Sequence, residues 1–348
     1  MKYLIFSDCH WSSYTSILRT RGDKFSVRLE YLIKSINWVN QTALELGCNA
    51  MICAGDFMDK SQCTDEELTA LRSLHWNNLP CYFICGNHES SVSDLRFSSI
   101  KAVESESRTI IDKITLLQND PACNLIMLPY ITETDRQPLH TYLEQLQLNS
   151  TKPNIIISHN DIAGINYAGF ESKEGFSIEE INDNCILYLN GHLHNSEFIN
   201  NKILNIGSFS AHNFTNDSMR YNYGIWLLDT ETRKLEFIAN PYSLQFYKLD
   251  INTEKDFELF SKIKPNAVLS IKYPPNLQEI LDKQLKKYHD LILSYRVILN
   301  NTSQTSCVDI TDVPLISSDY TEKFALFCRT NIQANPEILN SELAELFK

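Results

Sequence analysis

Residue types that bind metal ions occur at five points of the chain, each directly after a short apolar segment. These groups are Asp8 with His10, Asp56 with Asp59, Asn87 with His88 and Glu89, His159 alone, and His192 with His194. Oxygen ligands combined with imidazole nitrogens suit manganese, iron or zinc, and the sequence does not choose among them. Residues i and i+2 of an extended segment point the same way, so two of the groups could each direct a pair of ligands into one site.

Each group has a simpler explanation when taken alone. A D-x-H triplet has little specificity, residues 86–89 could be a turn with a helix cap, and residues 191–194 a turn with two exposed histidines. Five such groups in one chain, each at a strand end, have no comparable structural explanation. A carboxylate can bridge two cations about 3.5–4 Å apart, a separation that clamps both oxygens of an in-line displacement at phosphorus. The sequence therefore predicts a two-metal site.

The apolar segments have the length of strands, and amphipathic segments of helix length lie between them. The expected strands are 2–6, 50–54, 81–85, 124–130, 154–158 and 185–189, and the expected helices are 24–46, 64–76 and 136–148. Strands that alternate with helices indicate an α/β layered sandwich, in which ligand sites form at the carboxyl ends of the strands. Residues 198–238 lack a helical pattern and predict a second, antiparallel sheet beside the first.

The pattern changes at Asn240 and Pro241, where we place the end of a first domain of residues 1–240. Residues 241–300 predict a small α+β domain, with a strand at 244–249 followed by a helix, a strand at 267–272, a helix at 277–293 and a strand at 296–299. Residues 301–348 predict a polar linker and two short helices, which must pack on some surface to be stable.

The composition is that of an ordinary globular protein, with 43% hydrophobic and 21% charged residues among 348. No apolar run reaches the roughly 18–20 residues that cross a bilayer, and the apolar start is too short for a signal peptide. We therefore expect a cytoplasmic protein without membrane contact, whose ten cysteines are reduced. The net charge of −12 argues against a free-standing nucleic-acid binder, because an acidic surface repels phosphates.

In their order, the five groups resemble the signature of the calcineurin-like metallophosphoesterases: D-x-H, G-D-x-x-D, G-N-H-[DE], H and G-H-x-H. The resemblance implies a four-layer α/β/β/α sandwich that holds two divalent metal ions. It implies that one metal is held by Asp8, His10, Asp56 and His194, and the other by Asp56, Asn87, His159 and His192. Asp56 would bridge the two, and His88 would be catalytic, stabilising the transition state or protonating the leaving oxygen. Ser12 and Glu89 depart from the commoner glycine and aspartate, but neither is a ligand.

Within this superfamily the chain looks most like the SbcD-type nuclease subunits of SbcCD exonucleases, including those of phages. The likeness rests on Gly207 and Ser208, the expected hairpin at 229–238, and the C-terminal residues 241–348. It implies a manganese-dependent nuclease of DNA repair or recombination, with 3′-to-5′ exonuclease action on duplex ends and endonuclease action on single strands. It also implies a capping domain at 241–300 and helices in 301–348 that dock on the coiled coil of an SbcC-type ATPase, and it allows a homodimer.

The alternative is a small-molecule phosphodiesterase or phosphoprotein phosphatase with the same core. An acidic surface would suit it, but residues 241–348 would have no obvious role. A non-catalytic scaffold is disfavoured, because decayed members lose ligands and none is missing here.

A basic stretch follows the first group and offers candidate contacts to a DNA backbone: Arg19, Arg21, Lys24 and Arg28. A solvated start of a helix is the alternative explanation. His212, shortly after Gly207 and Ser208, could line the mouth of the site or be a polar loop residue.

Overall fold

The computed structural model describes residues 1–13, 22–91, 95–167, 170–215 and 218–299. Its contacts divide the chain into one unit of residues 1–300 and another of residues 301–348. The linker and docking helices expected in 301–348 lie outside the described residues, as do Arg19 and Arg21, so these expectations stay predictions.

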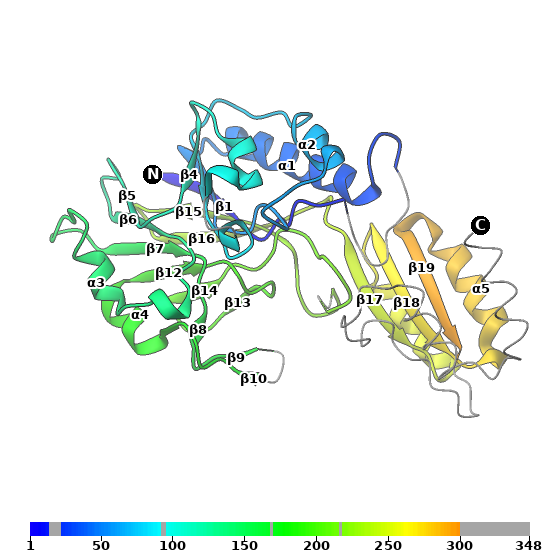
Figure 1. Ribbon diagram of the computed structural model, residues 1–348. Helices are drawn as coiled ribbons and strands as arrows, with labels where there is room; N and C mark the ends of the chain where they lie inside the picture. The colour runs from blue at the N-terminus through cyan, green and yellow to red at the C-terminus, as the bar shows by residue number, and fades with distance from the viewer. Residues whose placement is uncertain (14–21, 92–94, 168–169, 216–217, 300–348) are drawn as a thin grey trace, which may run out of the picture. The chain divides into compact units, whose positions relative to one another are not determined.

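The first of two large sheets has the strand order β16-β15-β1-β2-β3-β4. Its parallel strands are β1 (Lys2–Phe6), β2 (Ala50–Cys53), β3 (Cys81–Ile84) and β4 (Arg108–Ile111). The antiparallel strands that extend it beyond β1 are β15 (Gly224–Asp229) and β16 (Lys234–Ala239). The helices α1 (Val27–Glu45) and α2 (Asp65–Leu71) lie on its outer face (Figure 1).

The second sheet has the order β13-β14-β12-β7-β6-β5. Its strands are β5 (Thr115–Leu117), β6 (Asn124–Leu128), β7 (Asn154–Ser158), β12 (Leu187–Asn190), β13 (Glu197–Phe198) and β14 (Ile203–Asn205). The expectation of a separate antiparallel sheet from residues 198–238 is therefore wrong. β13 and β14 join this largely parallel sheet, whereas β15 and β16 extend the first.

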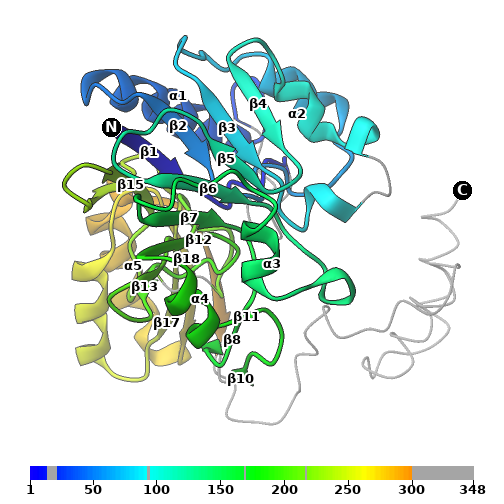
Figure 2. The same ribbon diagram turned by 90° about the vertical axis from the view of Figure 1, so that its left-hand side faces the viewer.

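The two sheets pack face to face between outer helices, which gives the expected four-layer α/β/β/α sandwich (Figure 2). The helices α3 (Leu139–Leu143) and α4 (Ile178–Asn184) cover the second sheet. Successive strand residues point to opposite faces. Leu4 and Phe6 of β1 thus pack with α1, whereas Tyr3 and Ile5 pack against the second sheet.

The sequence of helix α1 explains why this segment is helical. Ser26 Oγ accepts the Leu29 N–H at 3.3 Å and caps the first turn. Apolar residues then recur at intervals of three and four and form one buried face: Leu29, Leu32, Ile36, Val39 and Ala43.

A third sheet follows, with parallel strands β17 (Gln245–Asp250), β18 (Ala267–Tyr273) and β19 (Ile292–Leu299). The 3-10 helix η5 (Glu254–Lys262) and the helix α5 (Gln278–Lys287) contribute to a core with the strands that includes Leu249, Leu269 and Ile271. The predicted order of helix, strand, helix and strand is confirmed, except that the first helix is of 3-10 type. The domain limits at 240 and 300 stay predictions.

The remaining elements are short. After β7, the strand pairs are β8 (Ile162–Ala163) with β11 (Phe176–Ser177) and β9 (Asn166–Tyr167) with β10 (Phe170–Glu171). The 3-10 turns are η1 (Glu89–Ser91), η2 (Leu95–Phe97), η3 (Ser99–Val103), η4 (Glu133–Asp135), η6 (Pro275–Leu277) and η7 (His289–Leu291). Among the described helices, none combines the length and the apolar character needed to span a membrane.

Candidate metal centre

The carboxyl ends of β1, β2 and β3 in the first sheet and of β7 and β12 in the second lead into one site. All seven residues predicted as metal ligands lie together at this site, and His88 lies beside them. The seven are Asp8, His10, Asp56, Asn87, His159, His192 and His194. Loops that follow parallel strands meet at the same edge of a sheet, which explains the convergence.

A first cluster consists of Asp8, His10, Asp56 and His194. The Nε2 atoms of His10 and His194 lie 3.0 Å apart, and Asp8 Oδ1 lies 3.7 Å from His194 Nε2. Asp56 Oδ2 lies 3.8 Å from His10 Nε2. On the other side of the ring, Asp59 Oδ1 lies 3.3 Å from His10 Nδ1. This contact favours a proton on Nδ1 and leaves the Nε2 lone pair directed into the cluster.

A second cluster consists of Asp56, Asn87, His159 and His192. Asn87 Oδ1 lies 3.3 Å from His159 Nε2 and 3.1 Å from His192 Nδ1. Asp56 Oδ2, the oxygen that faces the first cluster, lies 3.3 Å from His159 Nε2. One carboxylate oxygen therefore faces both clusters, as a bridge between two cations requires.

The donor atoms fit two divalent cations. Asp8 and Asp56 are only 0% and 2% exposed, and among the described residues no donor reaches the buried Asp8 Oδ1. Carboxylates buried side by side are unfavourable unless positive charge lies between or beside them. The residues predicted to hold the metals thus have the charge, burial and orphaned acceptor that such ions would satisfy.

Four of the seven residues have left-handed backbone conformations, which non-glycine residues rarely adopt. Their φ angles are 53° at Asp8, 45° at His10, 48° at Asp56 and 74° at His192. Hydrogen bonds between the loops hold them, including Asp8 N to Gly55 O at 3.1 Å and His10 N to Asp56 O at 3.0 Å. Strain of this kind concentrates at functional sites, where the surrounding structure maintains it.

Two glycines are required by the close approach of the loops. A Cβ atom at Gly55, whose φ is 95°, would collide with the ring of His159, and one at Gly86 would collide with the carboxylate of Asp56. Any side chain at these positions would displace a predicted metal ligand.

Neighbouring acceptors orient two of the imidazoles. His159 Nδ1 donates to the Ala54 carbonyl oxygen at 2.7 Å, which leaves Nε2 for the second cluster. His192 Nε2 lies 3.1 Å from Asp161 Oδ1, which leaves Nδ1 for the same cluster. Acceptors of this kind fix the tautomer and rotation of metal-binding histidines. The sequence prediction did not include Asp161, although its position two residues after His159 was an available signal.

The clusters are coupled electrostatically. Burial alone would raise the pKa of Asp56, but the adjacent His159, followed by His10, lowers it well below the usual range. Burial alone would lower the pKa of His159, but Asp56 raises it on balance. Burial, partly opposed by Asp8, lowers the pKa of His194 to about 4.

Glu89 connects the loops after β2 and β3. Its fully buried carboxylate accepts the N–H groups of Met58 at 2.7 Å, Gly86 at 2.8 Å and Asp56 at 3.2 Å. Burial, followed by repulsion from Asp56, raises the pKa of Glu89 to about 7. The sequence had shown only that this residue departs from the commoner aspartate, whereas its side chain sets the position of Asp56.

His88 lies beside Asp56 on the accessible side of the site. Its N–H donates to Asp56 Oδ1 at 3.1 Å, and its Nε2 lies 3.9 Å from Asp56 Oδ2. The Nδ1 atom hydrogen-bonds to the Asp59 carbonyl oxygen. Burial opposes protonation, but Asp56 and Asp59 raise the pKa of His88 on balance. With 36% of its side chain exposed, His88 can meet a bound substrate.

The basic residues predicted to contact DNA lie in different surroundings. Lys24 is exposed, and a contact with DNA stays a prediction. Arg28 is only 2% exposed, and its Nη2 donates to the His10 carbonyl oxygen at 2.9 Å and contacts His212 Nδ1 at 3.0 Å. The surface contact to a DNA backbone expected of Arg28 does not agree with this burial.

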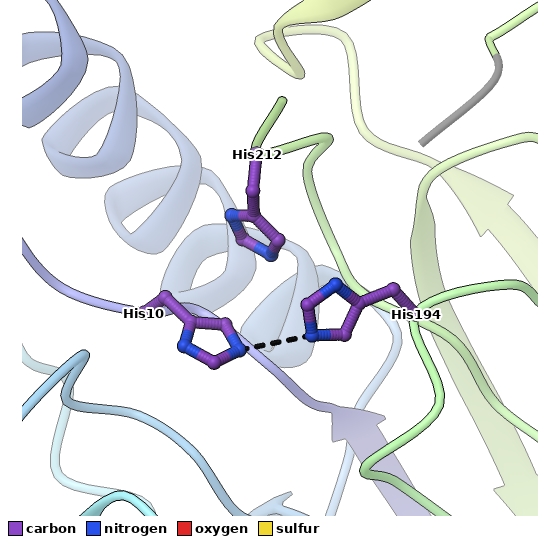
Figure 3. A group of neighbouring side chains, drawn as sticks. All are labelled: His10, His194 and His212. Atoms are coloured by element: carbon purple, nitrogen blue, oxygen red, sulfur yellow. Dashed lines mark hydrogen bonds between the residues drawn. The ribbon is translucent and has the colours of Figure 1, made fainter. Parts of the chain in front are cut away.

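His212 lies against the first cluster rather than at an outer mouth of the site. Its ring centroid is 4.8 Å from that of His10 and 4.9 Å from that of His194 (Figure 3). Burial, followed by the nearby His10 and Arg28, lowers the pKa of His212 well below its usual range.

Comparisons with known proteins find a matching family and similar solved structures. Residues 1–196 match the family model described as calcineurin-like phosphoesterase. Among solved structures, the chain is similar to TT1561 of Thermus thermophilus, with 16% identity over 68% of this chain and 98% of that one, at a TM-score of 0.41. It is also similar to an archaeal phosphodiesterase (16%, 69% and 99%, TM-score 0.35) and to a dimetal phosphatase from Danio rerio (8%, 65% and 91%, TM-score 0.38). No curated protein sequence gives a significant match.

Proposed function

The chain belongs to the calcineurin-like phosphoesterase family, and we propose that it is a two-metal phosphodiesterase that cleaves DNA. In this proposal it is the nuclease subunit of an SbcCD-type complex. That it is a metal-dependent phosphoester hydrolase follows from the family and from the His and Asp clusters. The choice of DNA, of manganese and of an ATPase partner is the proposal.

The observation that carries the DNA assignment is the third sheet. Strands β17 to β19 form a separate parallel sheet with a helix and a core of their own, after the segment that the family model matches. SbcD-type subunits, which the chain resembles, carry a capping domain at this place. A hydrolase of small molecules would need no such addition.

In this proposal the chain's own residues divide the work. Metal ions, when bound, would neutralise charge on the phosphoryl group and lower the pKa of a bound water. Asp56 holds the two clusters together, and Asp161 and the Ala54 carbonyl oxygen orient imidazoles toward them. His88 is held by Asp59 with its Nε2 on the side of Asp56, and in its protonated form it can donate to the leaving oxygen.

The net charge of −12 bears on how DNA would be held. An acidic protein gains little from the phosphate backbone, which supplies most non-specific affinity for DNA. A partner that binds DNA would remove this difficulty, which supports a complex with an SbcC-type ATPase. The same charge favours the alternative, a phosphodiesterase of small molecules or a phosphoprotein phosphatase.

The two candidates are separated by their substrates. The chain with Mn²⁺ is incubated with end-labelled duplex DNA, alone and with a candidate coiled-coil ATPase, and in parallel with bis(4-nitrophenyl) phosphate, 4-nitrophenyl phosphate and a phosphopeptide. We expect cleavage of DNA and of the diester, stimulated on DNA by the partner, and none by the Asp56→Asn control. Turnover of the small diester or of the phosphopeptide without any cleavage of DNA would replace the proposal by the alternative.

A further inference from the structure

A cavity of about 510 Å³ lies beside α2, η3 and the start of β4, and none of the predicted metal ligands lines it. Its volume is in the range of small-molecule sites, roughly 300–1,000 Å³. The buried side chains of Leu71, Leu74 and Val103, which belong to the core on the outer face of the first sheet, form its apolar wall. Two arginines, Arg72 and Arg108, also line it. The cavity therefore combines an apolar wall with positive charge.

Arg108 is held in one position at the side of this cavity. Its guanidinium carbon lies 5.2 Å from the ring centroid of Trp76, which is a cation–π contact. Its Nε donates to the Val103 carbonyl oxygen at 2.6 Å, and backbone hydrogen bonds to Ser105 fix the start of the strand. Among the described residues, no acceptor contacts its Nη1 and Nη2 atoms. These donors are thus positioned in advance for a ligand.

The charge of the two arginines is not neutralised by neighbouring side chains. Within the part of the chain that the structure describes, neither Arg72 nor Arg108 has a carboxylate at ion-pair distance. Glu104, which follows Val103 in the chain, instead contacts Lys101 Nζ at 3.2 Å. In a protein with a net charge of −12, two arginines without a carboxylate partner at one cavity indicate that the cavity receives an anion.

The lining indicates the chemistry of this anion. Arginine recognises phosphate with paired N–H donors. A bare inorganic ion would leave the apolar wall in water, whereas an aromatic group would cover that wall and could stack on Trp76 or on a guanidinium plane. We propose that the cavity binds an organic phosphate with an aromatic group, of the class of the nucleoside monophosphates. Arg72 and Arg108 contact the phosphate, and Leu71, Leu74 and Trp76 contact the aromatic group.

This inference does not rest on the proposed function, because binding is measured directly. Adenosine monophosphate, adenosine and inorganic phosphate are titrated by calorimetry into the full chain loaded with Mn²⁺. The nucleotide should bind more tightly than either of the other two, since each of them supplies only one of its parts. Arg72→Gln should weaken nucleotide binding about 10- to 100-fold, the size of one hydrogen bond to a charged group. The matched control Arg233→Gln, which changes an exposed arginine between β15 and β16, should leave it unchanged.

A phosphate could also bind at the metal centre, so the same titrations are made with Asp56→Asn, in which nucleotide binding at the cavity should persist. Ala102→Phe places a ring in the cavity from the exposed side of η3, so it should block the nucleotide while both arginines remain. Arg108→Lys keeps the charge beside Trp76 but loses the planar fork, and it should bind the nucleotide more weakly than the parent protein. Thermal unfolding and Mn²⁺ content of each variant show whether it is folded.

The inference is overturned if the nucleotide does not bind, or if Arg233→Gln weakens binding as much as Arg72→Gln. Binding that is lost in Asp56→Asn but kept in Arg72→Gln and Ala102→Phe would place the nucleotide at the metal centre instead. Equal affinities for phosphate and for the nucleotide would reduce the cavity to a simple anion site without a role for its apolar wall. Failure of the chain to cleave DNA would refute the proposed function but would leave these titrations intact.

Discussion

Replacing Asp161 by alanine should weaken metal binding at the second cluster. Asp161 Oδ1 lies 3.1 Å from His192 Nε2, and His192 Nδ1 lies 3.1 Å from Asn87 Oδ1. The carboxylate therefore holds the proton of the imidazole on Nε2 and keeps Nδ1 available as a ligand. Without Asp161, the ring can rotate and can adopt the tautomer in which Nδ1 carries the proton.

The size of the effect follows from the contact. A hydrogen bond to a charged group contributes about 1.5–3 kcal/mol. The side chains of Asp161 and His192 are 26% and 20% exposed, so water screens part of the interaction. We therefore expect the lower part of the range, about 1.5–2 kcal/mol, which corresponds to roughly 10- to 30-fold weaker binding. This agrees with the roughly 10- to 100-fold contribution of carboxylates that orient metal-binding histidines.

Titration calorimetry of chelator-treated protein with Mn²⁺ measures the two affinities. Asp161→Ala should weaken one of them, and Asp161→Asn, which keeps an acceptor oxygen, should weaken it less. A matched control is Asp290→Ala, which removes a carboxylate 3.0 Å from His289 Nε2 on the surface, where the side chains are 86% and 73% exposed. Two sites of parent affinity in Asp161→Ala, or an equal loss in Asp290→Ala, would refute this reasoning.

Three further predictions concern the roles of single residues and of the C-terminal segment. Asp56→Asn should release both metals because it removes the charge that faces the two clusters, and metal analysis showing full occupancy would contradict the bridging role. His88→Ala should keep both metals and the affinity for DNA but lose at least about 100-fold in rate, the scale of a general acid; a loss of metal would mean that His88 is a ligand. A chain that ends at Asn300 should keep its metal content and cleave short, easily opened DNA, yet lose stimulation by the ATPase and co-purification with it. Unfolding of the metal domain, or full partner binding, would exclude a docking role for residues 301–348.

The sequence predicted single elements well where burial is periodic. The helix expected at 24–46 is found at Val27–Glu45, and the strand at 154–158 has the predicted bounds. It did not predict how strands pair, because β14 and β15 have similar apolar patterns but join different sheets. The pairing depends on which residues meet across the layers, and local alternation does not encode that.

At the site, too, the sequence predicted what depends on local pattern and missed what depends on contacts between distant segments. The sequence predicted that the metal ligands lie together, because each of them follows a strand and the carboxyl ends of these strands lead into the same site. The surface position expected of Arg28 is wrong because the spacing of the helix decides its burial: Arg28 lies four residues before Leu32 and eight before Ile36, on the buried face of α1. Glu89 and Asp161 act through contacts with other loops, and residue type alone could not show those contacts.

The backbone conformation at the site affects how tightly metal ions would bind. The left-handed conformations of Asp8, His10, Asp56 and His192 cost on the order of 1–3 kcal/mol each. Hydrogen bonds across the loops maintain them, such as His192 N to Asp8 Oδ2 at 3.2 Å and Asp56 N to Glu89 Oε2 at 3.2 Å. Contacts within the fold therefore set the positions of the predicted ligands. Less of the binding free energy is then needed to order the loops, and more of it appears as metal affinity.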